Sequence, residues 1–336
     1  MYVLKKITKR IILLFITLVF VYLIFANLDI KELCNVIKGF NCIYIIPLIC
    51  SILFSLSLRG LIFKQLLHKT VNPPLIELAH LCITTAAMNI VFPARAGDIY
   101  RAYYIGQKYK TDKVKVFGTV MFERIFDIIA VFSFLFIAVF IYHRNIIALH
   151  LCSFAGICMI FGIILAIFAY KYNKTDVICR FIITKTKKVP FSGFIEKVIL
   201  YINRMCNSFF MGFEAIDSLK YMFFAILTSF SIWFFECLNF YIVMQGFNCH
   251  IHWSVTLFLI GFIALACMIP STSIFIGPYQ MAVIAAFNMY NINKETALAI
   301  SLVEQSVVVI ATTITAVLFF IKNNITYREI KNDMSR

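Results

Sequence analysis

The sequence predicts an all-α, polytopic membrane protein with about six full spans and two pairs of shorter, broken helices. Hydrophobic residues make up 62% of its 336 residues, charged residues only 14%, and phenylalanine occurs 36 times. The mean hydropathy of +0.91 is typical of membrane proteins and excludes an ordinary soluble domain. The individual runs of apolar residues, in chain order, indicate the same fold class.

Six apolar runs approach the roughly 20 residues with which a helix crosses a hydrocarbon core. Three of them contain no Asp, Glu, Lys or Arg: Ile11 to Ala26, Phe40 to Leu58 and Ile146 to Tyr170. Three more qualify if each accepts a few ionisable residues: Val116 to Tyr142, Tyr221 to Met244 and Ala297 to Ile321. The first run follows several basic residues, as in a secretory signal, but no small-residue cleavage site follows it. We therefore expect a retained first helix.

Two further apolar runs are too short to cross the bilayer, and each ends in a polar break that contains a proline. They are Leu78 to Phe92 and Ser254 to Met268. We expect each run to pair with the chain after it as a re-entrant or broken helix, over about 78–110 and about 253–290. Four residues are expected to shape these turns: Pro93, Gly97, Pro270 and Gly277.

The 31 lysines and arginines predict the orientation, because short cytoplasmic loops collect basic residues. With a cytoplasmic N-terminus, few basic residues fall outside the cell. We therefore expect a protein of the cell (inner) membrane with both termini in the cytoplasm. The net charge of +15 then reflects orientation and attraction to anionic lipid headgroups, so no nucleic-acid partner is expected.

The same order of elements recurs in two halves of the chain: two spans, a re-entrant pair and a span with carboxylates. Each half crosses the membrane an odd number of times, so the second copy is inverted relative to the first, as in many transporters. The predicted first repeat is 1–145. The second is 146–321 and includes a cytoplasmic amphipathic segment at 171–220. A cytoplasmic tail follows at 322–336.

Several function classes lack their sequence signatures. Neither GxxxxGK[ST] nor GxGxxG occurs, so no nucleotide cofactor is expected. The 11 cysteines contain no CxxC pair and mostly lie in apolar runs, as small core residues do. His250 and His252 have no third ligand nearby in sequence, so no metal is expected either.

Six ionisable residues gather around the first broken pair and the start of the following span. Glu123 and Asp127 share one helix face, with Arg124 beside them. Each charge at membrane depth costs roughly 2.5 to 3.5 kcal/mol on insertion scales, which implies partners or a function. The two arginines and one aspartate at 95–101 can neutralise all three charges. The predicted substrate-binding set is Arg95, Asp98, Arg101, Glu123, Arg124 and Asp127.

Two interpretations of this cluster stay open. In the structural one, a neutral ion-pair clasp fixes the tip of the broken pair to the next helix. In the functional one, Arg95 and Arg101 offer forked donors to the phosphate of a lipid headgroup. No residue is predicted to be catalytic. In the second half, Glu236 and Glu304 lie at depth without a nearby basic residue; they either pair with arginines of the first half or couple transport to protons.

The motif residues are similar to those of a known family. The first stretch matches P-x-R-x-G-[ED]-x-x-R at Pro93, Arg95, Gly97, Asp98 and Arg101. The second matches E-R-x-x-D at Glu123, Arg124 and Asp127. Together they resemble the flippase-like membrane family that includes the transmembrane region of lysylphosphatidylglycerol synthases. The family usually has glutamate at the position of Asp98, and it commonly has glutamate where this chain has Gln280.

The resemblance implies lipid handling rather than lysyl transfer, which a soluble C-terminal domain carries in the two-part synthases. We therefore expect a lipid transporter or flippase for an anionic phospholipid or a polyprenyl-phosphate-linked lipid. The alternative is an enzyme or enzyme subunit of lipid modification, either lysylphosphatidylglycerol synthase-like or a lipid-linked glycosyl transferase, acting with a separate catalytic partner. A third is a membrane anchor for such a synthase. A homo-oligomer is compatible with each of them.

Overall fold

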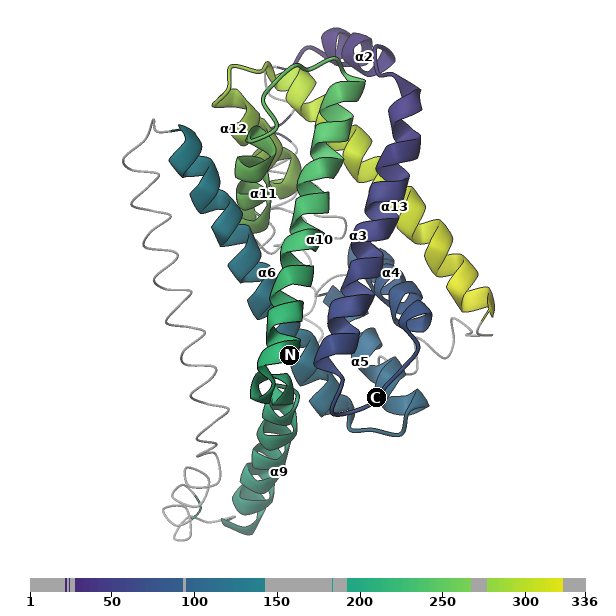
Figure 1. Cartoon of the computed structure of the whole chain (residues 1–336), viewed down its shortest axis with the longest axis vertical. Coiled ribbons are helices and arrows are strands. Elements are labelled where there is room, and N and C mark those ends of the chain that lie inside the picture. The colour runs from purple at the N-terminus through teal and green to yellow at the C-terminus, as the bar shows by residue number, and fades with distance from the viewer. Residues whose placement is uncertain are drawn as a thin grey trace.

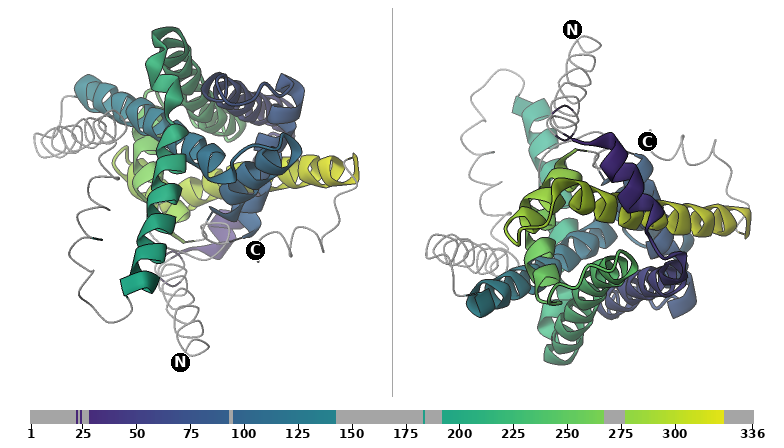
Figure 2. Two further views of the ribbon diagram at one scale, coloured as in Figure 1. Left: turned by 90° about the horizontal axis from the view of Figure 1, so that it is seen from below. Right: turned by 90° about the horizontal axis from the view of Figure 1, so that it is seen from above.

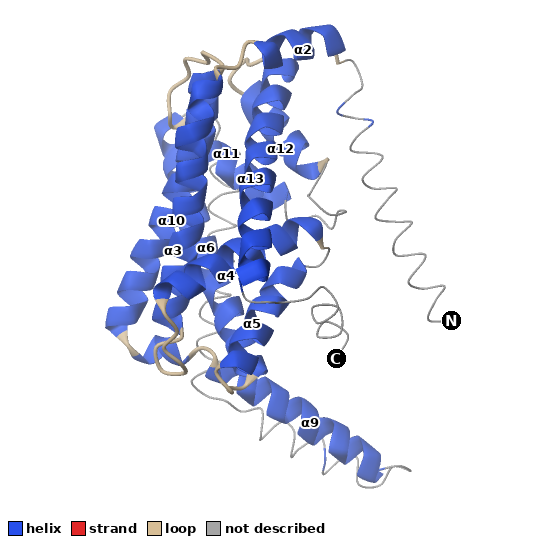
Figure 3. Ribbon diagram, turned by 90° about the vertical axis from the view of Figure 1, so that its right-hand side faces the viewer, coloured by secondary structure: helices blue, strands red, loops and turns tan. Residues whose placement is uncertain are grey.

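The computed structural model describes residues 28–92, 95–142, 192–266 and 277–322, together with residues 22, 24 and 183. Every regular element in this part of the chain is a helix (Figure 1). The long helices run roughly along the longest axis of the molecule, and shorter helices pack between them or lie at the ends (Figures 1 and 3).

The prediction of an all-α membrane protein is confirmed. Among the described residues, four helices are long and apolar enough to cross a membrane. They are α3 (Ile45–Leu66), α6 (Lys113–Tyr142), α10 (Leu219–Gly246) and α13 (Lys294–Lys322). Each coincides with a predicted span. The two other predicted spans, at 11–26 and 146–170, lie outside the described residues except for Tyr22 and Ile24.

Helix α3 continues past Leu58, where the predicted span ends, and reaches Leu66. The prediction ends early because Arg59 interrupts the run without charges. In the structure Arg59 lies inside the bundle, 3.1 Å from a carboxylate oxygen of Asp127 on α6. A paired arginine costs far less at membrane depth than an isolated one, so the helix does not end at this charge.

Two pairs of short helices occupy the positions of the predicted broken segments. They are α4 (Leu75–Val91) with α5 (Ala96–Lys108), and α11 (Val255–Ala266) with α12 (Pro278–Asn288). Figure 1 shows the first pair in the lower half of the molecule and the second in the upper half. The predicted turn residues Pro93 and Pro270 lie outside the described residues.

The packing of the short helices is reciprocal between the two halves. Helix α5 packs against α6 and α12 packs against α13. In exchange, α4 packs against α13 and α11 packs against α6. This is the arrangement expected of two related halves in which each short helix pair also packs against a long helix of the other half. The division of the chain into repeats at residue 145 stays a prediction.

The remaining elements lie at the ends of the bundle. Helix α2 (Ile30–Lys38) crosses the upper end and packs against α13 (Figures 1 and 2). The short 3-10 helix η1 (Cys42–Tyr44) leads into α3. Helix α9 (Ser192–Met211) extends from the lower end and packs against α6, and the 3-10 helix η3 (Glu214–Asp217) joins it to α10 (Figure 3).

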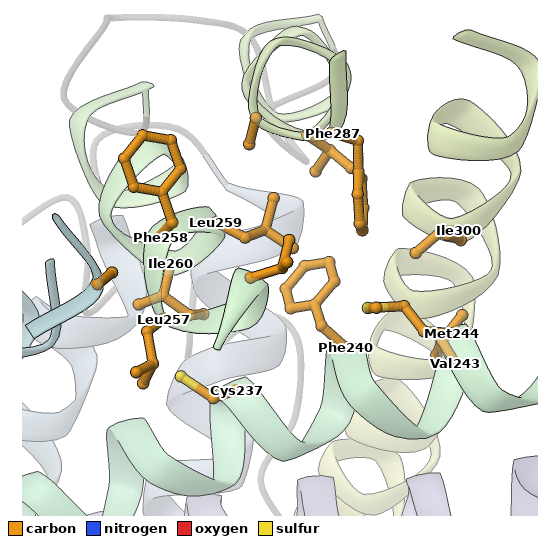
Figure 4. Close-up of a cluster of buried hydrophobic side chains, with 14 of the residues drawn as sticks. Cys237, Phe240, Val243, Met244, Leu257, Phe258, Leu259, Ile260, Phe287 and Ile300 are labelled. Carbon is orange, nitrogen blue, oxygen red and sulfur yellow. The ribbon is translucent and has the colours of Figure 1, made fainter. Parts of the chain in front are cut away.

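The largest apolar core lies where α10 meets α11, α12 and α13 (Figure 4). Phe240 and Met244 of α10 lie among buried side chains that include Leu259 of α11, Phe287 of α12 and Ile300 of α13. Lipid tails are as apolar as these residues, so van der Waals packing, rather than transfer out of water, holds such a core together. The core fixes α10 and α11, both of which line the site.

Candidate functional site

Charged side chains of α5 and α6 form a connected ion-pair network inside the bundle. Arg101 Nη2 lies 2.9 Å from Glu123 Oε2. Arg124 bridges two aspartates, with Nη2 2.9 Å from Asp98 Oδ1 and Nη1 2.9 Å from Asp127 Oδ2. Asp98 and Arg101 are 1% exposed and Glu123 is 0% exposed. Both ion pairs, Arg101 with Glu123 and Asp98 with Arg124, lie within the predicted six-residue cluster, whose individual pairings the sequence leaves open.

Arg59 of α3 belongs to the same network, although it is absent from the predicted set. Its Nη1 lies 3.1 Å from Asp127 Oδ2 and 3.7 Å from Glu123 Oε1. Its guanidinium carbon lies 5.8 Å from the centre of the Trp233 ring. One signal in the sequence points to it: a lone arginine that is followed by further apolar residues, as in RGLIF, lies within a span and needs a partner.

The start of α5 brings its charges close to α4. Gly97 permits this approach, because a Cβ atom there would collide with the carbonyl oxygen of Thr85 and lie 2.8 Å from Asn89 Oδ1. Asn89 Nδ2 in turn donates a hydrogen bond to Asp98 Oδ1 at 3.4 Å. Arg95, at the N-cap, has the left-handed angles φ 53° and ψ 45°, which suit a sharp turn into a new helix.

The guanidinium of Arg101 is enclosed on every side. Its carbon lies 4.4 Å from the centre of the Phe63 ring, and its Nη1 donates to Cys82 Sγ at 3.3 Å. Glu123 lies on the remaining side, and with 1% of the residue exposed its donors are closed off from a ligand. In this structure Arg101 neutralises Glu123 and braces α5 against α3, α4 and α6.

A cavity of about 350 Å³ opens beside the network, between α6, α10 and α11. Its polar end is formed by three arginines and one aspartate: Arg59, Arg95, Arg124 and Asp127. Trp233 of α10 lies beside them, and the other walls are Ile128, Val131, Phe132, Leu135, Gly261, Ile263 and Ala264. Of the six predicted substrate-binding residues, the cavity therefore includes Arg95, Arg124 and Asp127. The other three, Asp98, Arg101 and Glu123, lie behind it.

One stripe of helix α6 runs the length of the cavity. Arg124 and Asp127 begin it, and four apolar residues continue it at 128, 131, 132 and 135. Steps of three and four residues keep these side chains on one face of a helix. From residue 124 to residue 135 the stripe extends about 16 Å at 1.5 Å per residue. The cavity is thus charged at one end and apolar along the rest of its length.

Asp127 accepts three neighbours, whereas Arg95 has no acidic partner among the described residues. The carboxylate of Asp127 accepts hydrogen bonds from Arg59, Arg124 and the Trp233 indole, with the last at 3.0 Å. Arg95 is exposed, and no described carboxylate lies within 4.0 Å of it. The predicted pairing of Arg95 with a carboxylate of α6 is therefore not found. The observed cluster contains four arginines and three carboxylates and has a net charge of +1. The six predicted residues alone have a net charge of zero.

The second broken pair contains an uncharged counterpart of this network. Gly277 is the N-cap of α12 with φ 102°, as Arg95 is the N-cap of α5. Three residues later, Gln280 Nε2 donates to Gln305 Oε1 at 2.6 Å, just as Asp98 pairs with Arg124. The separations along the chain are 25 and 26 residues. An acid and a base in the first half are thus matched by two amides in the second.

The two predicted coupling carboxylates form no ion pair among the described residues, although Glu236 lies close enough to Arg59 to interact with it electrostatically. Glu304 is 5% exposed and accepts a hydrogen bond from the hydroxyl of Tyr279. Glu236 accepts from Ser55 Oγ at 3.2 Å and from Asn239 Nδ2 at 3.4 Å. Neither has a basic partner within 4.0 Å in the described part of the chain, which also contains no cluster of three metal-ligating side chains.

Comparison with known proteins agrees with this architecture. The profile of the family described as the lysylphosphatidylglycerol synthase TM region matches residues 10–316. A UPF0104 membrane protein of Methanocaldococcus jannaschii is 25% identical over 249 residues, which are 73% of this chain and 98% of that protein. No solved structure matches the chain significantly. The chain is a multi-pass membrane protein that belongs to the family of the lysylphosphatidylglycerol synthase transmembrane region.

Proposed function

We propose that this protein is a lipid transporter or flippase, which moves a lipid with an anionic phosphate headgroup between the leaflets of the membrane. The observation that carries the proposal is the cavity with three arginines at one end and an apolar stripe of α6 along the rest. Guanidinium groups present forked donors that match phosphate oxygens. An amphiphile fits such a cavity with its phosphate at the arginines and its chain along α6.

The surrounding network suits a site that must hold positive charge at membrane depth. Arg59 and Arg124 are held by Asp127, which fixes their direction toward the cavity. Behind them, Asp98 and the Arg101–Glu123 pair anchor the start of α5. Fixed partners of this kind hold binding groups in place before the ligand arrives, which favours affinity. Arg95 then supplies a charge that forms no ion pair within 4.0 Å with a described carboxylate.

The reciprocal packing of the two halves supports transport rather than simple binding. Each short helix pair contacts a long helix of its own half and a long helix of the other half. In transporters with inverted repeats, one half rocks against the other around a site at their interface. The cavity occupies such an interface, because α6 comes from the first half and α10 and α11 from the second. We place the protein in the cell membrane with both termini in the cytoplasm, as the basic residues predict.

A reconstitution experiment tests the proposal. The purified protein is placed in liposomes with fluorescent phosphatidylglycerol or a fluorescent polyprenyl phosphate, and movement between leaflets is followed by quenching of the outer leaflet. Arg95→Gln should slow movement about tenfold or more, because a hydrogen bond to a charged group contributes about 1.5 to 3 kcal/mol. Arg95→Lys should recover part of the rate. Lys69→Gln is the matched control, since Lys69 is exposed and pairs with Asp217 outside the cavity.

Two further arms test the lipid tail and the enzyme alternative. Ala264→Phe fills the apolar wall without changing charge and should also slow movement, whereas inorganic phosphate should not compete. Wild-type protein that moves none of the lipids, or a folded Arg95→Gln variant with the wild-type rate, overturns the proposal. Formation of a lysyl or glycosyl lipid from lysyl-tRNA or a nucleotide sugar would instead identify an enzyme.

A further inference from the structure

We infer that the cavity selects phosphate headgroups without an amino group, and that it discriminates against aminoacylated or amine-bearing lipids. The inference rests on the proposed function, since it concerns the headgroup end of the same cavity. It narrows the substrate class to lipids whose headgroup carries a phosphate and no amino group. The saturated carboxylate of Asp127 and the exposed Arg95 set this preference.

A lipid with an ammonium group needs an acceptor, and Asp127 is already occupied. Arg59 Nη1 lies 3.1 Å from Oδ2, Arg124 Nη1 lies 2.9 Å from Oδ2, and Trp233 Nε1 lies 3.0 Å from Oδ1. An ammonium group that bound Asp127 would have to displace one of these donors and leave it unsatisfied. Leaving a buried donor without a partner is costly, so binding through Asp127 is disfavoured.

Among the described residues, no other carboxylate lines this end of the cavity. Asp98 and Glu123 are almost fully buried and do not line it, and neither does Glu236. The two breaks of the broken helix pairs, at 93–94 and 267–276, contain no acidic residue in their sequence. The lining residues therefore present three positive charges and one negative charge to a headgroup.

The charge balance favours an anion. A phosphatidylglycerol headgroup carries one negative charge, which complements the positive excess of the site. A lysylphosphatidylglycerol headgroup carries two ammonium groups and one phosphate, so its net charge repels the three arginines. At the effective dielectric of a partly buried site, one such repulsive contact changes affinity by about tenfold or more.

Binding can be measured separately from transport through Trp233. The chain has 2 tryptophans, and Trp253 is 47% exposed outside the cavity. Trp253→Phe leaves Trp233 as the reporter at the headgroup end. The detergent-solubilised variant is titrated with lipids whose acyl chains carry bromine, which quenches nearby tryptophan. Phosphatidylglycerol and lysylphosphatidylglycerol with the same brominated chains form the matched pair.

We expect half-maximal quenching at a concentration about tenfold or more lower for phosphatidylglycerol than for lysylphosphatidylglycerol. Arg95→Glu adds a free carboxylate at the site and should remove or reverse the preference. Lys69→Glu makes the same charge change on the exposed surface and should leave it unchanged. Equal half-maximal concentrations for the two lipids in the parent protein overturn the inference, as does an unchanged preference in a folded Arg95→Glu variant. Selective binding without lipid movement in liposomes contradicts the proposed function alone.

Discussion

The buried Arg101–Glu123 pair predicts a specific pattern of stability in a double-mutant cycle. The two side chains are 1% and 0% exposed and lie 2.9 Å apart. At an effective dielectric of 20, their attraction is about 6 kcal/mol, and the cost of desolvation offsets much of it. Removing one partner of such a pair destabilises a protein by about 3 to 5 kcal/mol, because it leaves the other charge buried and unpaired.

We expect Arg101→Met to lower the free energy of unfolding by about 3 kcal/mol, the lower end of that range. Arg59 explains the lower value, since its Nη1 remains 3.7 Å from Glu123 Oε1 and compensates part of the charge. Arg101→Met combined with Glu123→Gln should lose only about 1 kcal/mol, because no uncompensated charge is left. Glu123→Gln alone should also cost about 3 kcal/mol, because it leaves Arg101 buried without its nearest carboxylate, so the coupling energy of the cycle is about 5 kcal/mol. Reversible unfolding in mixed detergent micelles, followed by circular dichroism, measures each value.

The exposed pair of Lys69 and Asp217 is the matched control, with side chains 39% and 50% exposed at 3.1 Å. Its cycle should give a coupling energy below about 1 kcal/mol. Additive losses at Arg101 and Glu123 would refute the reasoning that the pair is a buried brace. A stable double variant that no longer moves lipid would show that the pair contributes to transport beyond bracing the helices.

Three further predictions concern the turns and the polar contacts. Gly97→Ala should destabilise the protein by about 1 to 3 kcal/mol, because the methyl group collides with the α4 backbone; thermal melting against Gly39→Ala measures this. Trp233→Phe keeps a ring but removes the donor to Asp127, and should lower stability by about 1 kcal/mol. Gln280→Glu should destabilise the protein, and adding Gln305→Arg should recover stability if the two amides occupy the places of an ion pair.

Local sequence signals account for much of the fold. The four described spans coincide with apolar runs, and the proline breaks separate two short helices in each pair. Helix periodicity also places Glu123 and Asp127 on one face of α6. The pairings of Arg101 and Asp98 agree with simple charge matching between neighbouring segments of the chain.

The parts that sequence reasoning did not reach depend on contacts between distant segments. Arg59 meets Asp127 across 68 residues, and Trp233 meets the same carboxylate across 106. The pattern of apolar residues in one helix shows which face is buried, but it does not show which other helix packs against that face. Arg95 shows the converse case: it pairs with neither Glu123 nor Asp127, because Arg101, further along α5, holds the first and Arg59 of α3 holds the second.

The unequal chemistry of the two broken pairs bears on how a symmetric architecture handles one lipid. If both helix pairs bore charges, a lipid phosphate would have two equivalent binding sites. Moving from the first site to the second would then bring no gain in affinity. Here Asp98 and Arg124 form an ion pair at the first pair of helices, whereas Gln280 and Gln305 form an uncharged contact at the second. Under the proposed function, phosphate binding is then concentrated at the first helix pair, so we expect movement to consist of exposing that site alternately to the two leaflets. Turning the second site into a charged one by Gln280→Glu with Gln305→Arg should then slow lipid movement even where it restores stability, and an unchanged rate in that variant would contradict the single-site scheme.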